Sequence, residues 1–460
     1  MIKNLENFIN DLKLKNITIK NVGIEKYLLE KRGNFISKAK YVVLPKNTEE
    51  VSYILKKANI FLINIVPQGG NTGLVGGSLA NELDVILNLS MMDKIIEVDI
   101  LNKSVTLEAG ISINKLNSYL KKYKLEFPLY LPSYKECSIG GNIATNAGGI
   151  NAIKYGTTRD LVLGIEMVSG SGEILHDLTS LRKRNIGMDI KNIGIGSEGT
   201  LGIVTKASLK LTYIKKYSLN VMIGVHKTNI IKKILKIVNY NFFDYIQAFE
   251  LMNDESINIV KDITNIKIKI NKIAKYNVLI QFKSNLKNCL QIVKDSIYLM
   301  LEKMEKNNNI MFFQIYNNDK IWEIRNAIPE AQKKIGFNLK NDFSVSISKI
   351  FVALEKINVA IKKFNKKLIS VIFGHLGDGN LHINIIDVGN KNNLKEKQDE
   401  LKQILVKIIM ELDGTFSAEH GIGMLNKKYL KQYYPLNRNM LIRIKEILDK
   451  NLILNKNKLM

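Results

Sequence analysis

The sequence predicts an α+β protein with two domains. Its 460 residues exceed the roughly 100–200 residues of one ordinary domain. Short β-rich runs, helical segments and two glycine-rich tracts share the first part of the chain. Beyond it, strands and amphipathic helices alternate in a way typical of an antiparallel sheet. We therefore expect a first domain over residues 1–213 and a second over 214–460, with about 410–460 returning to the first domain.

The first domain is expected to begin with a strand, a helix and a strand over residues 41–66. Asn47 and Thr48 are the candidate N-caps of the helix. Further strands are expected at 84–90, 104–110 and 203–213, and a hairpin around Gly-Ser-Gly at 162–175. In the second domain, the same reasoning predicts strands at 217–225, 244–252 and 276–282, and helices at 229–241 and 286–307.

The composition argues against several classes of protein. The net charge is +25, but most of the basic residues are lysines spread along the whole chain. Nucleic-acid readers usually cluster their charge and rely on arginine, so we expect no nucleic-acid partner. The two cysteines, Cys137 and Cys289, favour a reducing compartment. Without a signal peptide or an apolar span in the sequence, a cytoplasmic location is expected. A peripheral membrane contact stays open.

The first glycine-rich tract is "PQGGNTGLVGGS", residues 67–78, between two predicted strands. Glycines let successive backbone N–H groups surround an anion, and a diphosphate is the natural guest. The tract lacks the Gly-Lys-Ser/Thr of a P-loop and opens no helix, so neither common nucleotide fingerprint applies. The "GIGSEG" at 194–199 continues into a strand-like segment, which argues against a dinucleotide fingerprint there.

The second tract is "CSIGGNIATNAGG", residues 137–149. Its small residues would let backbone pack against a flat ring system, and its amides and hydroxyls could reach ring nitrogens and carbonyls. A tight structural turn is the alternative interpretation.

Two of the five histidines, His375 and His382, flank a glycine-rich centre. Asp378-Gly379 predicts a two-residue hairpin turn, which would place the two imidazoles directly opposite each other, in reach of one metal ion. Glu419 could add a carboxylate, and Asn384 would share the face of His382. Such a set suits zinc, and manganese or iron is also allowed. A hydrogen-bonded pair without metal is the alternative.

Five motifs in order carry a resemblance to a known family. They are "PQGGNTGLVGGS", "CSIGGNIATNAGGINAIKYG", "IGSEGTLGIVT", "GHLGDGNLHIN" and "FSAEHGIG". Together they resemble the FAD-linked D-2-hydroxyacid dehydrogenases of the vanillyl-alcohol-oxidase type, and the segment 178–202 is most similar to the D-2-hydroxyglutarate branch. The resemblance implies a PCMH-type FAD-binding domain followed by an antiparallel-sheet cap, the FAD-linked oxidase C-terminal domain.

The resemblance also implies which residues hold FAD. The diphosphate would lie in the first loop, against Pro67, Gly69, Gly70, Asn71, Thr72, Gly73, Leu74, Gly76, Gly77 and Ser78. The flavin and ribityl chain would lie against Cys137, Gly140, Gly141, Asn142, Thr145, Asn146, Gly148 and Gly149. The adenosine half would meet Glu198, Gly199, Gly202 and Ile203. Some relatives tether flavin through a histidine in the first loop. This chain has Asn71 there, so FAD is expected to be non-covalent.

By the same resemblance, His375, His382 and Glu419 bind a divalent metal, with zinc the expected ion, and His420 is the catalytic base. Asn384 matches an amide that faces flavin or substrate. Arg325 and Lys340, on a predicted helix and a following strand, match residues that bind substrate carboxylates.

The expected reaction is oxidation of a D-2-hydroxy acid to the 2-oxo acid by hydride transfer to flavin N5, with D-2-hydroxyglutarate giving 2-oxoglutarate. D-lactate or glycolate is the alternative substrate, and a metal-dependent hydrolase is the alternative class. An electron-transfer flavoprotein or a quinone is the expected electron acceptor. A homodimer stays open.

Overall fold

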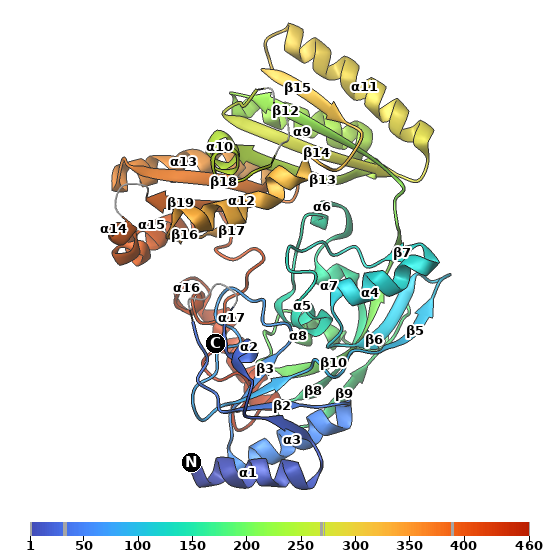
Figure 1. The fold of residues 1–460 in the computed structure, drawn as a ribbon, viewed down its shortest axis with the longest axis vertical. Helices are drawn as coiled ribbons and strands as arrows, with labels where there is room; N and C mark the ends of the chain where they lie inside the picture. Colours follow the sequence, from blue (N-terminus) through green and yellow to red (C-terminus); the bar gives the residue numbers. More distant parts are fainter. Residues whose placement is uncertain (1, 31–34, 267–269, 271, 388–390, 460) are drawn as a thin grey trace. The chain divides into compact units, whose positions relative to one another are not determined.

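The computed structural model describes residues 2–30, 35–266, 270, 272–387 and 391–459. The chain divides into two compact units (Figure 1). The first unit comprises Met1–Gly149, Tyr155–Ile214 and Glu419–Met460, and the second comprises Ile150–Lys154 and Lys215–Ala418.

A mixed four-stranded sheet lies in the first unit, in the order β1 (Thr18–Lys20), β2 (Tyr41–Leu44), β4 (Val85–Asn88), β3 (Ile65–Gln68). β2 and β3 both run parallel to β4, and α3 (Thr48–Phe61) connects β2 to β3. The Asn47 side chain caps α3 by accepting a 2.8 Å hydrogen bond from the Glu50 amide, as the sequence predicts. The apolar face of α3, with Val51, Ile54 and Leu55, is fully buried.

The other large sheet of the first unit is antiparallel, in the order β5 (Ile95–Asp99), β6 (Ser104–Glu108), β10 (Gly202–Lys210), β8 (Val162–Ser169), β9 (Ile174–Asp177). β8 and β9 form the hairpin expected around Gly-Ser-Gly. One hydrophobic cluster runs through both sheets, as shown by the burial of Leu87 from β4 and Leu107 from β6. β7 (Leu125–Glu126) and β11 (Thr212–Tyr213) form a separate two-stranded antiparallel sheet.

The helices assigned to the first unit include α1 (Ile2–Leu14), α2 (Glu25–Leu28), α4 (Ile113–Leu120), α5 (Ile139–Thr145), α7 (Thr158–Leu161), α8 (Lys191–Gly194), α16 (Lys427–Tyr433) and α17 (Pro435–Leu448). The residues of α6 (Ala152–Tyr155) are divided between the units, with 152–154 assigned to the second and Tyr155 to the first. In the described part of the chain, none of the helices combines the length and apolarity that a bilayer crossing requires.

The C-terminal segment belongs to the first unit although it follows the second in sequence. α16 and α17, drawn in red, lie near β3 and α2 in Figure 1. The backbone of Ile65 in β3 donates to the Ile453 carbonyl at 2.9 Å and accepts from the Asn455 amide at 2.8 Å. The chain thus returns to the edge of the parallel sheet, where the first glycine-rich loop begins.

The second unit is built on an eight-stranded sheet whose strand pairs are all antiparallel among the described residues. Along the sheet the order is β15 (Phe312–Tyr316), β12 (Tyr217–Val225), β14 (Tyr276–Ser284), β13 (Ile246–Asn253), β18 (Leu368–His375), β19 (Asn380–Asp387), β16 (Asn338–Leu339), while β17 (Asp342–Ser344) also pairs with β19. The α+β class and the antiparallel sheet are confirmed.

Helices cover both faces of this sheet. α10 (Asp254–Ile263) and α12 (Trp322–Ile335) share a hydrophobic cluster with one face, which includes Met252 and Phe373. On the opposite face of the β18–β19 hairpin, Leu381 and Ile383 adjoin Leu354 of α13 (Ile350–Phe364). The remaining helices are α9 (Thr228–Phe242), α11 (Lys287–Lys306), α14 (Lys391–Glu396) and α15 (Gln398–Met410).

Candidate active site

The hairpin of β18 and β19 carries the two histidines, but its register differs from the predicted one. Phe373, not His375, lies opposite His382. The prediction of a two-residue turn at Asp378-Gly379 is therefore wrong, because four residues, 376–379, connect the strands. Asp378 folds this longer turn by accepting a hydrogen bond from the Asn380 amide at 3.1 Å. A shift of two residues keeps every side chain on its face, so both histidines still point to the same side.

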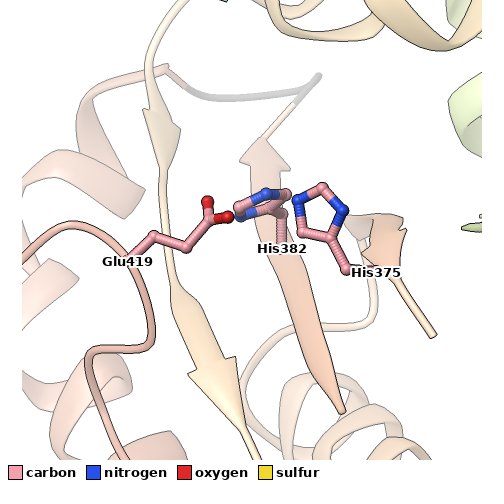
Figure 2. Close-up of side chains that lie close together, drawn as sticks. All are labelled: His375, His382 and Glu419. Carbon is pink, nitrogen blue, oxygen red and sulfur yellow. The ribbon is translucent and has the colours of Figure 1, made fainter. Parts of the chain in front are cut away.

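The imidazoles of His375 and His382 are diagonal neighbours, with ring centroids 5.6 Å apart and planes at 79°. Glu419 directly follows the segment 415–418, whose Ser417 bridges Asp342 of β17. One donor atom from each of His375, His382 and Glu419 lies within 4.8 Å of the others. Figure 2 shows the Glu419 carboxylate pointing toward the His382 ring, with the His375 ring beside it.

This donor set fits a divalent metal ion. Zinc bonds to nitrogen and oxygen are about 2.0–2.2 Å long, so ligands of one ion lie at most about 4.4 Å apart. The three donor atoms, all within 4.8 Å of one another, are close enough together to be candidate ligands of one ion. Two histidines and one carboxylate, with open positions for water or substrate, are typical of catalytic zinc sites.

A buried glutamate, Glu250 of β13, links His375 to Arg325 of α12. Its Oε1 lies 2.6 Å from His375 Nδ1, and its Oε2 accepts a 2.6 Å hydrogen bond from Arg325 Nε. Burial opposes ionisation of Glu250, but the charges of Arg325 and His375 and these two bonds outweigh it and lower its pKa to about 2. Glu250 is therefore a carboxylate at any physiological pH.

His382 has a carboxylate neighbour of its own. Asp342 of β17 lies opposite it in the sheet, and the Asp342 Oδ1 is 3.7 Å from His382 Nδ1. Asp342 is buried, and its Oδ1 accepts a 2.8 Å hydrogen bond from the Asn380 side chain. A carboxylate near the outer nitrogen of a metal-binding histidine is a common arrangement, because it orients the ring.

The structure places Arg325 on the sheet-facing side of α12, almost fully buried, with its guanidinium 5.1 Å from the centre of the Phe373 ring. Among the residues that the structure describes, none hydrogen-bonds either terminal nitrogen of Arg325. That end of the guanidinium can hold a carboxylate. Lys340 lies half-buried between β16 and β17 in the same unit.

Asn384 lies two residues beyond His382 on β19 and on the same face, as predicted. Its Nδ2 donates to Gln332 Oε1 of α12 at 2.8 Å, and its Oδ1 accepts a 3.3 Å bond from the Asn341 amide. Asn384 thus holds α12 to the hairpin, and its predicted flavin- or substrate-facing role stays a prediction. His420 follows Glu419 and is half-buried.

In the first unit, the loop over 67–78 starts at the carboxyl end of β3, where ligands of parallel sheets usually bind. Asn71 adopts φ 52° and ties the loop together, donating to the Leu29 carbonyl and accepting from Ser78, both at 2.8 Å. The C-terminal segment supports the loop, because Met424 donates its amide to the Val75 carbonyl at 2.9 Å.

The glycines of this loop divide into two kinds. At Gly69 and Gly70 an added Cβ would overlap Ser138 and the Glu136 carbonyl, so these glycines let the two glycine-rich tracts approach. At Gly73 and Gly77 no described atom lies within 4 Å of where a Cβ would stand. The backbone at these two glycines is therefore open on the Cβ side, as a loop that surrounds a diphosphate with its N–H groups would require.

The tract over 137–149 forms α5 and the turn after it. Ser138 caps α5, and Asn146 adopts φ 48° and accepts from Thr157 and from the Arg159 amide. Cys137 is buried, which raises the pKa of its thiol. The other members lie along the same stretch: Gly140, Gly141, Asn142 and Thr145 in α5, and Gly148 and Gly149 beyond it.

The residues predicted for the adenosine half have structural roles in the first unit. Glu198 accepts backbone hydrogen bonds from Ile422 at 2.6 Å and from Gly423 at 2.7 Å, so both its oxygens are occupied. Burial raises the Glu198 pKa against the effect of these bonds. Gly199 contacts Pro67 and Gly202 approaches the Val168 carbonyl, while Ile203 lies in the core.

Sequence reasoning missed Glu250, Asp342 and Gln332. The signal for Glu250 was present, because it is the one acidic residue in the apolar run "IQAFELM". A carboxylate in the middle of a buried strand needs a cationic or hydrogen-bonding partner. The partners themselves, in α12 and β18, could not be named without the fold.

Two family profiles match the chain. The one described as FAD binding domain matches residues 39–177, and the one described as FAD linked oxidases, C-terminal domain, matches residues 235–459. The first profile covers much of the first unit. The second covers most of the second unit and the C-terminal segment that belongs to the first unit.

Curated relatives cover most of the chain. A probable D-2-hydroxyglutarate dehydrogenase of Oryza sativa subsp. indica is 35% identical over 433 residues, which is 92% of this chain and 75% of the relative. A D-2-hydroxyglutarate dehydrogenase of Xanthomonas citri pv. viticola is 31% identical over 91% of this chain and 88% of its own. A D-2-hydroxyglutarate–pyruvate transhydrogenase of Saccharomyces cerevisiae is 32% identical, over 84% and 79%.

A solved structure of alkyldihydroxyacetonephosphate synthase shares the fold, with a TM-score of 0.75, 19% identity, and coverage of 98% of this chain and 84% of that one. The chain belongs to the FAD-linked oxidase family, among the FAD-dependent D-2-hydroxyacid dehydrogenases. FAD is its cofactor, and a small 2-hydroxy acid is its class of substrate.

The two kinds of glycine in the first loop predict different defects. Gly73→Ala should leave the fold of the apoprotein intact and weaken FAD binding at least about tenfold, because the methyl group enters the open space proposed for the diphosphate. Gly70→Ala should destabilise the protein with or without FAD, by about 1–3 kcal/mol or more, because its Cβ overlaps backbone. FAD titration and thermal melting of the apoproteins separate the two; equal FAD affinity in Gly73→Ala and wild type would contradict the diphosphate assignment.

Proposed function

We propose that the enzyme oxidises D-2-hydroxyglutarate to 2-oxoglutarate. The observation that carries this proposal is the cluster on one face of the second unit's sheet. Metal-binding residue types, His375 and His382, lie there beside Arg325, a buried arginine whose terminal nitrogens are available. The names of the relatives from Oryza sativa and Xanthomonas citri support the same substrate.

In the proposed site, His375, His382 and Glu419 hold a divalent metal, with zinc the expected ion. A metal ion held by these residues would supply polarisation of the substrate hydroxyl, and FAD held by the first unit would supply the acceptor for the hydride of C2. FAD binds without a covalent link, because residues 67–78 include no histidine and the Asn71 side chain already bonds Leu29 and Ser78.

The chain's own residues carry the remaining work. Arg325 and Lys340 bind the substrate carboxylates and so orient C2. His420 accepts the proton of the C2 hydroxyl as general base, since an imidazole titrates near neutral pH. With the hydride and the proton removed, the C2–OH carbon becomes the carbonyl of the 2-oxo acid, and the electrons leave through an acceptor.

The electron acceptor is proposed to be an electron-transfer flavoprotein or a quinone. The name of the yeast relative, a D-2-hydroxyglutarate–pyruvate transhydrogenase, includes a 2-oxo acid. Pyruvate is therefore the third acceptor to compare with an electron-transfer flavoprotein and a quinone. Reoxidation rates of the reduced enzyme with each of the three would identify the acceptor class.

A substrate comparison tests the proposal. With an artificial electron acceptor, kcat/KM for D-2-hydroxyglutarate should exceed the values for D-lactate and glycolate by at least about tenfold, because those acids lack the second carboxylate. L-2-hydroxyglutarate serves as the stereochemical control and should be inactive. A larger kcat/KM for D-lactate or glycolate would support the same class of reaction but would contradict D-2-hydroxyglutarate as the substrate.

A further inference from the structure

Glu250 occupies an unusual position between two proposed functional residues. It lies in β13, a central strand of the sheet, directly across from His375 of β18, and its side chain has no solvent exposure. Each of its oxygens has one partner, His375 on one side and Arg325 on the other, both at 2.6 Å. A buried carboxylate of this kind is costly unless it is fully paired, so the arrangement calls for a role.

The contact with His375 determines which ring nitrogen is available. Glu250 accepts from the Nε–H of Arg325 through its other oxygen, as the carboxylate of an ion pair does, so the Nδ1 that lies 2.6 Å from its Oε1 is the nitrogen that carries a proton. Nε2, the other ring nitrogen, is then the one left to bind a metal ion. Glu250 thus fixes both the tautomer and the orientation of the imidazole.

The contact with Arg325 determines which part of the guanidinium is available. Nε is engaged by Glu250, and the central carbon of the guanidinium lies 5.1 Å from the centre of the Phe373 ring. The two terminal nitrogens, which no described residue bonds, form the fork that recognises a carboxylate. Glu250 thereby holds this fork in a fixed direction.

We propose that Glu250 is a positioning residue that orients the metal-binding nitrogen of His375 and the carboxylate-binding fork of Arg325 at the same time. The inference rests on the proposed function, from which it takes the roles of His375 and Arg325. It adds a residue that touches neither metal nor substrate, yet sets the affinity for both.

Glu250→Gln is the direct test, because an amide of the same size can accept from only one of the two partners. If the amide NH₂ group faces His375, it donates to Nδ1, the imidazole proton moves to Nε2 and metal binding is lost. If the NH₂ group faces Arg325, it cannot accept from Nε and the guanidinium is displaced. We expect the Kd for Zn²⁺ in the chelator-stripped, FAD-loaded protein to rise about tenfold to a hundredfold, and the KM for D-2-hydroxyglutarate to rise about tenfold or more.

Glu250→Asp covers the case in which Glu250→Gln does not fold. It keeps the charge that neutralises Arg325 but is one methylene too short to bond both partners, so it should fold and still weaken Zn²⁺ binding. Glu166→Gln is the matched control, because Glu166 of β8 also lies buried between a histidine and a cation, His176 at 3.1 Å and Lys206 at 3.0 Å. That variant should lose stability without changing the Kd for Zn²⁺ or the KM.

The outcomes separate the inference from the proposed function. If wild type binds Zn²⁺ and oxidises D-2-hydroxyglutarate, but both Glu250 variants keep its Kd and KM, the positioning role is overturned and the function stands. If Glu166→Gln weakens Zn²⁺ binding equally, Glu250 acts through general stability, and the inference also fails. A wild type that takes up no Zn²⁺ overturns the metal site and the His375 part of the inference together.

Discussion

His420→Ala is expected to abolish nearly all turnover while FAD stays bound. A positioned general base contributes about 10²–10⁴-fold to the rate, so kcat/KM for D-2-hydroxyglutarate should fall by that factor. The flavin absorption should be retained, since the residues proposed for FAD lie in the two glycine-rich tracts and in 198–203. Stopped-flow reduction of the flavin under anaerobic conditions measures the affected step directly.

His226→Ala is the matched control, because His226 is exposed and lies outside every motif. It should reduce flavin at the wild-type rate. If His420→Ala also reduced flavin within about twofold of wild type, where a general base predicts a loss of 10²-fold or more, His420 would not be the base. A His420→Ala protein that lost its FAD would point to a cofactor-binding role in place of proton transfer.

His375→Ala is expected to lose metal and activity together. The substitution removes one of the three proposed ligands and leaves the buried Glu250 carboxylate without one of its two partners. The affinity for Zn²⁺ should fall at least about a hundredfold, a larger loss than a change next to a ligand causes. Metal analysis of the purified protein and a Zn²⁺ titration with a competing chelator provide the measurement.

His176→Ala controls for loss of a histidine–carboxylate pair, since His176 bonds the buried Glu166 at 3.1 Å. Its metal content should match that of wild type. An unchanged metal content in His375→Ala would show that the ligand assignment is wrong, and a low metal content with full activity would show that the metal is not required.

The element types of the second unit were predictable because strand and helix periodicities differ clearly there. The β12, β13 and β14 segments and the α9 and α11 segments all have the predicted type, with ends that differ by at most two residues. α10 was not predicted. It starts directly after β13, and Asn253 is both the last residue of the strand and the N-cap of the helix, so no loop residues mark the boundary.

The histidine pair shows what the sequence could and could not specify. Alternation along the strands placed His375, His382 and Asn384 on one face, and the structure agrees. The register was wrong by two residues because Asp-Gly predicts a two-residue turn, whereas Asp378 here belongs to a four-residue connection. A shift of two residues leaves each side chain on its face of the sheet, so the three residues still lie on one side.

Contacts between distant segments were beyond sequence reasoning. Glu250 and Arg325 are 75 residues apart, and only the packing of α12 on the sheet brings them together. Likewise, Glu198 was assigned to ligand contact by its motif, but its carboxylate binds the amides of Ile422 and Gly423. The predicted contact of Glu198 with adenosine stays a prediction, because which atoms a side chain uses depends on tertiary structure.

The most direct test of the account is the visible spectrum of the purified protein, recorded anaerobically before and after addition of D-2-hydroxyglutarate. We expect a flavin spectrum that bleaches on addition of this acid, and no bleaching with L-2-hydroxyglutarate. A flavin spectrum that none of D-2-hydroxyglutarate, D-lactate and glycolate bleaches, in folded protein loaded with FAD and Zn²⁺, would contradict the proposed reaction.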